Sequence, residues 1–238
     1  MPESPSEVDL EQRMAAWAAT SSKAELSPEI RRRIQGKLTP SLSLVNPLPS
    51  HGRLVLLFIA IFTVCGAALI AILGKAGFHL MTTAQITGVA VVFAAGGILF
   101  AQMLAWRMVP GSRPSFPVPL AMTLSGLAVI GAIAALFPWQ APAAFVSEGW
   151  PCAVLELIIA IPAALVFWLI ARRGALFASA GLGATLTGLA VLLALVPLQT
   201  QCMFQQAPHL LLWHGGTAAV VVGLGGLIGE FQSSRSGG

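Results

Sequence analysis

The stretch that decides the fold runs from Cys152 to Cys202 and reads CAVLELIIAIPAALVFWLIARRGALFASAGLGATLTGLAVLLALVPLQTQC. Its only charged residues are Glu156 and the pair Arg172-Arg173. Each half contains at least the roughly 20 apolar residues that a helix needs to cross the hydrocarbon core of a bilayer. The chain is therefore predicted to cross a membrane from Cys152 to the arginines and to return to Cys202. Both cysteines should emerge on the same face.

The composition of the whole chain supports the same class. Of 238 residues, 56% are hydrophobic and only 9% are charged, and the mean hydropathy is +0.83. A soluble domain carries about 25% charged residues. The net charge of +4 does not indicate nucleic-acid binding, because the basic residues follow the membrane crossings and form no basic stripe interleaved with aromatics. The sequence predicts an all-α, polytopic membrane protein.

Six apolar segments are long enough to span a bilayer. They are Leu54–Leu73, Gln85–Trp106, Val118–Phe137, Cys152–Ala171, Ala175–Leu198 and Leu210–Ile228. The second is the weakest prediction, because it contains two glutamines. The chain is thus predicted to have a polar N-terminal tail and linker (1–53), a six-helix transmembrane domain (54–229) and a short C-terminal tail (230–238).

Two features predict how the spans pack. Pro162 should kink the fourth span, because proline cannot donate the backbone hydrogen bond of a helix. Small residues four apart in the last two spans should let those helices pack closely against their neighbours. These residues are Ala180, Ala184, Gly188, Gly225 and Gly229.

The distribution of Lys and Arg predicts the orientation. If the N-terminus is cytoplasmic, the cytoplasmic segments hold twelve of the thirteen basic residues, and the outer loops hold only Lys75. Segments near the membrane ends that are rich in Lys and Arg stay inside. Both termini are therefore expected in the cytoplasm, and the loops that bear Cys152 and Cys202 are expected outside.

The N-terminal tail contains two helix patterns. The first covers 6–19, and the second begins at Ser27-Pro28-Glu29 with a capping serine, a proline and an acid in the first turn. No apolar segment lies near Met1, so no cleaved signal peptide is expected. The run from Thr39 to Ser50 is rich in proline and serine and is typical of a linker.

The second helix pattern carries a narrow apolar edge. Ile30, Ile34 and Leu38 recur every four residues, beside the basic residues Arg31, Arg32 and Arg33. Two amphipathic helices without a core of their own need an apolar surface. That surface is either the lipid interface or a groove on a partner protein.

The cysteines offer several interpretations. Cys65 lies inside the first span and is expected to be buried, as free cysteines usually are. Cys152 and Cys202 are expected at the outer surface, where three alternatives stay open: a structural disulfide, a thiol pair that senses oxidants or soft metals, or no pairing. Both should be accessible to a thiol reagent applied from outside.

Three titratable residues are possible helpers of the cysteine pair. Glu156 lies one helical turn after Cys152, and an ionisable residue within a span is a functional candidate. His209 and His214 flank the start of the sixth span. Residues five apart do not share a face of an α-helix, so interfacial hydrogen bonding is favoured over metal ligation, and no metal or cofactor is predicted.

No catalytic constellation is visible. The chain contains no CxxC, no HExxH, no P-loop and no nucleophile elbow, so an enzyme is not expected. A small transporter or channel is the alternative from a different class, with Glu156 and the kink at Pro162 lining a path.

An ordered set of features resembles the NrsF-type (negative regulator of sigma F) integral-membrane anti-sigma factors. The set comprises six spans, Trp150-Pro151-Cys152, Arg172-Arg173-Gly174-Ala175, a second cysteine at Cys202, and Leu212-Trp213-His214-Gly215-Gly216. The likeness is best over residues 150–229. At His214 the chain departs from the family pattern, in which a tyrosine is expected. The tail also lacks the His-x3-Cys-x2-Cys signature of zinc-binding anti-sigma domains.

The resemblance implies a protein of the bacterial inner membrane that does not itself bind nucleic acid. Its cytoplasmic N-terminal segment would hold an extracytoplasmic-function sigma factor inactive. Its paired outer cysteines, which correspond to Cys152 and Cys202, would take part in a stress response.

Overall fold

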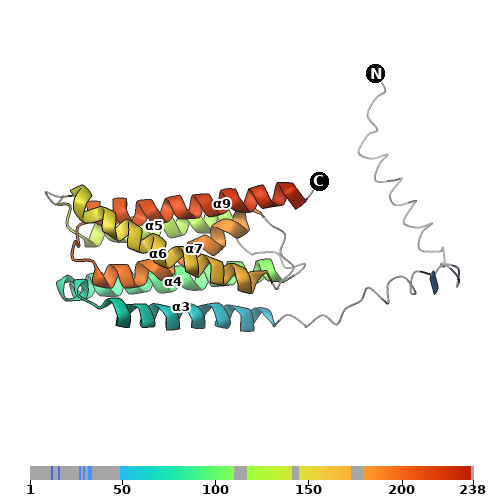
Figure 1. Ribbon diagram of the computed structural model, residues 1–238, viewed down its shortest axis with the longest axis horizontal. Helices are drawn as coiled ribbons and strands as arrows, with labels where there is room; N and C mark the ends of the chain where they lie inside the picture. The colour runs from blue at the N-terminus through green and yellow to red at the C-terminus, as the bar shows by residue number, and fades with distance from the viewer. Residues whose placement is uncertain are drawn as a thin grey trace, which may run out of the picture. The chain divides into compact units, whose positions relative to one another are not determined.

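The computed structural model describes residues 49–109, 117–140, 145–172 and 179–236, and six single residues of the N-terminal tail (Figure 1). These six are Gln12, Ala16, Ser27, Glu29, Arg32 and Arg33. The chain divides into two compact units, Met1–Pro47 and Leu48–Gly238.

The second unit is built from helices. In chain order they are α3 (His51–Leu73), the 3-10 helix η2 (Gly77–Leu80), α4 (Thr83–Met108), α5 (Val118–Leu136), α6 (Phe145–Ala171), α7 (Ala180–Gln201), α8 (Ala207–His209), the π-helix η3 (Leu210–Gly216) and α9 (Thr217–Ser236). The described residues include no strand. The predicted all-α class is confirmed.

Within the described residues, six helices are long and apolar enough to cross a membrane, as predicted. The sixth is composite, because α8, η3 and α9 follow one another without a break and give a span of Ala207–Ser234. The fourth begins at Phe145, seven residues before the predicted start at Cys152. Two prolines lie inside α6, Pro151 and the predicted kink residue Pro162.

One of the two glutamines that weakened the prediction of the second span has a structural role. Gln85 forms a capping box with Thr82. Its side-chain Oε1 accepts a hydrogen bond from the backbone N–H of Thr82 at 2.8 Å, and the backbone N–H of Gln85 donates to Thr82 Oγ1 at 3.3 Å. Gln85 Nε2 also donates to the carbonyl of Leu136 at the end of α5. The glutamine therefore satisfies backbone groups where α4 begins.

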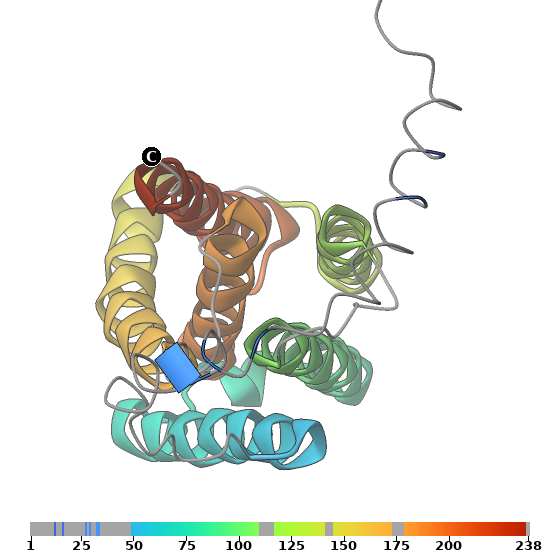
Figure 2. The same cartoon turned by 90° about the vertical axis from the view of Figure 1, so that its right-hand side faces the viewer.

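The bundle is arranged around α7. This helix packs against α3, α4, α6 and α9, and most of its length is buried (Figure 2). Its sequence explains the position, because it combines aliphatic residues with alanine and glycine and carries no charge. Leu189, Ala190 and Ala194 are almost completely inaccessible.

The outer surface of the bundle is apolar. Large hydrophobic side chains such as Leu56, Ile72, Val220 and Leu227 are more than 60% exposed. A soluble protein rarely presents so many exposed apolar residues on neighbouring helices. This surface is suited to contact with lipid chains, in agreement with a multi-pass membrane protein.

Glycines bring α7 and α9 close together. A Cβ atom at Gly183 would overlap the carbonyl of Gly225, and one at Gly229 would overlap the carbonyl of Ser179. Gly225 and Gly229 therefore act as predicted. Gly188 acts as predicted too, because a Cβ there would meet the ring of Phe100 on the neighbouring helix α4.

The first unit is described only at single residues. Gln12, Ala16, Glu29, Arg32 and Arg33 are helical, and Arg33 Nη2 pairs with Glu29 Oε1 at 3.2 Å. This pair is exposed and spans one helical turn. The remaining residues of the predicted stripe, Ile30, Arg31, Ile34 and Leu38, lie outside the described residues.

Candidate functional site

Cys152 and Cys202 lie side by side. The two Sγ atoms are 4.0 Å apart, although 50 residues separate the cysteines in sequence. Cys152 lies in α6, and Cys202 caps the C-terminus of α7. The prediction that both cysteines emerge at the same end of the bundle is confirmed.

The length of α6 is compatible with a position of Cys152 near the membrane boundary. A helix of 27 residues is about 40 Å long, and the hydrocarbon core is about 30 Å thick. Cys152 lies seven residues into this helix, about 10 Å from its start. The extra turns before Cys152 can therefore project beyond the core.

A short loop positions Cys202. Gln205 Nε2 donates to the carbonyl of Cys202 at 2.6 Å, and Gln199 Nε2 donates to Gln205 Oε1 at 2.9 Å. These buried contacts fold residues 202–206 back on the end of α7. Cys202 is consequently only 5% exposed, so the expected accessibility to thiol reagents is wrong for this residue. Cys152 is half-buried.

The surroundings keep the Cys202 thiol protonated. Its pKa is raised above the ordinary value by the hydrogen bond with the Cys152 sulfur and by burial. Burial disfavours the charged thiolate. Both effects favour the neutral thiol of Cys202.

The π-helix η3 brings the two histidines together. In a π-helix each amide bonds to the carbonyl five residues earlier, so residues five apart lie above one another. His209 immediately precedes this segment and His214 lies within it, and their ring centroids are 5.5 Å apart. The expectation that the two histidines do not share a face is therefore wrong.

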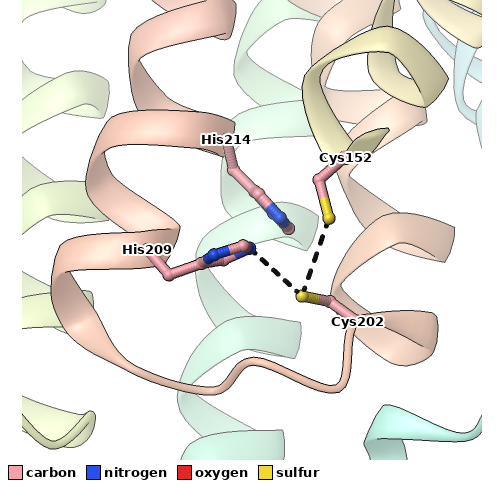
Figure 3. Close-up of side chains that lie close together, drawn as sticks. All are labelled: Cys152, Cys202, His209 and His214. Carbon is pink, nitrogen blue, oxygen red and sulfur yellow. Dashed lines mark hydrogen bonds between the residues drawn. The ribbon is translucent and has the colours of Figure 1, made fainter. Parts of the chain in front are cut away.

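Four side chains converge at this end of the bundle (Figure 3). One ligand atom each from Cys152, Cys202, His209 and His214 can be chosen so that all four lie within 4.8 Å of one another. His209 Nε2 is 3.5 Å from Cys202 Sγ. The four residues come from α6, the end of α7 and the start of the sixth span. We call them the Cys/His cluster.

The cluster is enclosed by close backbone contacts. A Cβ atom at Gly77 in η2 would overlap the carbonyl of Cys202, and one at Gly149 in α6 would overlap the indole of Trp213. Trp213 Nε1 also donates to the carbonyl of Phe145 at 3.1 Å. These contacts join the first turns of α6 to η3 and hold η2 over Cys202.

Two other predicted residues have different environments. Glu156 is completely buried, and neither carboxylate oxygen has a hydrogen-bond partner among the described residues. Cys65 is exposed on α3, so the prediction that it is buried is wrong. Its exposed side chain faces the surroundings of the bundle. Cys65 lies on α3, a helix that supplies no residue to the Cys/His cluster.

Comparisons with known proteins do not assign the chain to a class. No protein-family model matches it, and no curated protein and no solved structure matches it either. The likeness to NrsF-type anti-sigma factors stays a prediction from the sequence. The fold and site define a six-span membrane protein with a buried cluster of two thiols and two imidazoles.

The arrangement allows two kinds of chemistry. The sulfur atoms would form a disulfide if they moved about 2 Å closer, since an S–S bond is about 2.05 Å long. Alternatively, two thiolates and two imidazoles are a donor set for a tetrahedral metal ion. Both reactions use the same sulfurs, so they exclude each other.

Proposed function

We propose that the chain is a membrane-embedded anti-sigma factor. Its N-terminal tail holds an extracytoplasmic-function sigma factor at the inner membrane, and the outer thiol pair controls release. The observation that supports this function best is the pair itself: two free thiols 4.0 Å apart, held at one end of the bundle. The sequence resemblance and the amphipathic tail supply the proposed partner.

Packed helices connect the thiol pair with the start of α3, the helix that follows the tail in the chain. The chain enters α3 at Ser50, and the far end of α3 leads into η2, which contacts Cys202. The 23 residues of α3 cover about 35 Å. Leu54 and Phe58 at the start of α3 belong to the same buried core as Leu189 and Ala190 of α7. A movement of α7 at its Cys202 end therefore has a packed route to the start of α3.

The sensing reaction is an ordinary two-electron oxidation. Hydrogen peroxide takes two electrons from the two thiols, its O–O bond breaks, and the two thiol protons leave in two molecules of water. The product is a Cys152–Cys202 disulfide. Closing this bond draws the start of α6 toward the end of α7.

The proposed orientation places the Cys/His cluster outside and both termini in the cytoplasm. It can be tested with single cysteines at exposed positions, Leu80→Cys in η2 and Ser234→Cys near the end of α9, in a chain whose three native cysteines are serine. A membrane-impermeant maleimide applied to spheroplasts should label only the first variant. Labelling of Ser234→Cys in intact spheroplasts would contradict the orientation.

The experiment that tests the function compares transcript profiles with and without the chain. Deleting the gene should raise transcription from one set of promoters with a shared sequence, because the sigma factor is no longer held. Full-length protein should restore repression, whereas residues 51–238, present in the membrane at the same level, should not. Unchanged transcripts after deletion would exclude an anti-sigma function.

A transporter receives less support from the structure. Glu156 is buried and has no hydrogen-bond partner among the described residues, which would suit a proton pathway. However, Pro162 lies on the exposed side of α6. Neither of the two described cavities, each of about 300 Å³, is lined by Glu156 or Pro162. The path that the alternative requires is not present in either cavity.

A further inference from the structure

We infer that Cys152, Cys202, His209 and His214 form a four-coordinate site for a divalent metal ion of the zinc type. The proposal refines the sensing step, and it rests on the proposed function only for its regulatory consequence. Metal binding itself is a property of the membrane domain, so it can be tested without a sigma factor.

The distances between the ligand atoms suit a tetrahedral ion. With Zn–S bonds of about 2.3 Å and Zn–N bonds of about 2.05 Å, tetrahedral geometry places two sulfurs about 3.8 Å apart and a sulfur and a nitrogen about 3.6 Å apart. The two Sγ atoms are 4.0 Å apart, and Cys202 Sγ is 3.5 Å from His209 Nε2. A metal ion would thus need little rearrangement of the cysteines or of His209.

The imidazole nitrogens lack sufficient partners without a ligand. His209 and His214 are at most 3% exposed. Nδ1 of His209 and both ring nitrogens of His214 have no hydrogen-bond partner among the described residues. An unsatisfied buried polar atom costs about 1–3 kcal/mol. A bound ion would coordinate one of these His214 nitrogens.

Charge selects a divalent ion. Two thiolates and two neutral imidazoles carry a charge of −2, so a divalent ion makes the complex neutral. Burying a neutral complex avoids the large desolvation cost of a buried charge. A monovalent ion would leave a net negative charge close to Glu156, which is itself completely buried one turn after Cys152. Mg²⁺ and Ca²⁺ are disfavoured because they prefer oxygen ligands.

The site is closed, which favours a structural or regulatory ion. All four positions of a tetrahedral ion are taken by protein ligands, whereas a catalytic zinc keeps one position open. The ligands come from three segments, α6, the end of α7 and the start of the sixth span. A bound ion would fix these segments together. Oxidation of the two thiols to a disulfide would remove two ligands and release the ion.

The test is a titration of the purified, reduced, full-length protein in detergent, first stripped of metal by a chelator. Co²⁺ should bind at one equivalent and give the intense visible bands of a tetrahedral site and a sulfur-to-cobalt charge-transfer band. Zn²⁺ should then displace it. Weak octahedral bands, or tight binding of Cu⁺ without binding of Co²⁺ or Zn²⁺, would overturn the proposal.

Variants separate the four-ligand site from a simple thiol pair. His214→Gln should weaken Co²⁺ affinity by at least about 100-fold, since even changes beyond the direct ligands cost 10- to 100-fold. Cys65→Ala is the matched control and should bind as the native chain does, because Cys65 is exposed on α3. Unchanged affinity in His214→Gln, with loss only in Cys152→Ser, would show that the histidines are not ligands.

A second measurement uses only the native protein and so does not depend on the folding of a variant. At a Zn²⁺ concentration about 100 times Kd, the metal-free population falls about 100-fold, so alkylation by iodoacetamide of Cys152, the half-buried cysteine of the cluster, should slow by a similar factor. Alkylation of Cys65 should keep its rate and serves as the internal control. Equal rates at Cys152 with and without Zn²⁺ would contradict the site.

Discussion

Replacing either Cys152 or Cys202 with serine is expected to abolish induction of sigma-dependent transcription by a thiol oxidant. Coupling between two sites in one protein is typically worth about 5- to 150-fold, so the native chain should give about tenfold induction or more. A disulfide needs both sulfurs, and these lie 4.0 Å apart. Each single variant should therefore lose the response as completely as the double variant, measured with a reporter before and after diamide.

The control for this prediction is Cys65→Ser. Cys65 is a free cysteine on α3 outside the Cys/His cluster, so its replacement should leave induction intact. Two residues that act as one unit give non-additive effects. Partial defects that add up in the double variant would indicate two independent sites instead of one pair.

The second large effect is expected in the tail. Replacing Ile30 and Ile34 with aspartate should release the partner and raise transcription without any oxidant, because both residues belong to the predicted apolar edge. Two buried anchors are worth about 4 kcal/mol together, roughly a thousandfold in affinity. The measurement is the reporter signal in the double variant, with the amount of membrane-inserted protein checked.

Matched variants separate the apolar edge from its charges. Ile30→Leu with Ile34→Leu keeps the hydrophobic character and should keep repression. Arg32→Ala should weaken binding mainly at low salt, since charges at the rim of an interface chiefly steer the encounter. If the tail only rests on lipid, it should bind anionic vesicles without a partner, and the double aspartate variant should leave the reporter low.

The membrane fold was predictable because its signal extends over many residues. Each span needs about 20 apolar residues, and errors of a few residues at the ends do not change the number of crossings. The main boundary error was at α6, which begins at Phe145, seven residues before the predicted start at Cys152. Gln85 weakened the prediction of the second span, because its contacts with Thr82 and with the carbonyl of Leu136 form only in the folded chain.

The cluster was only partly predictable. The position of Cys152 and Cys202 on the same face follows from counting crossings, but the contribution of His209 and His214 depends on a π-helical segment. Spacing rules for α-helices place residues five apart on different faces, so they fail there. The double glycine that follows His214 is the one local signal of a weakened α-helix in this part of the chain.

The exposure of Cys65 and the burial of Cys202 could not be predicted from the sequence either. Free cysteines are usually buried, but a membrane span can present one to lipid on its outer face. Cys202 is buried because Gln199 and Gln205 fold the following loop and because η2 packs on its backbone. The contact between η2 and Cys202 joins segments far apart in sequence, so a local pattern does not predict it.

The most direct test of the central claim is the amount of sigma factor retained by membranes before and after oxidation. Membranes from cells with the native chain should retain the sigma factor and lose most of it after diamide, whereas membranes with Cys152→Ser and Cys202→Ser should retain it in both conditions. Retention that does not depend on the presence of the chain, or release that is equal in the native and double-serine proteins, would contradict the account.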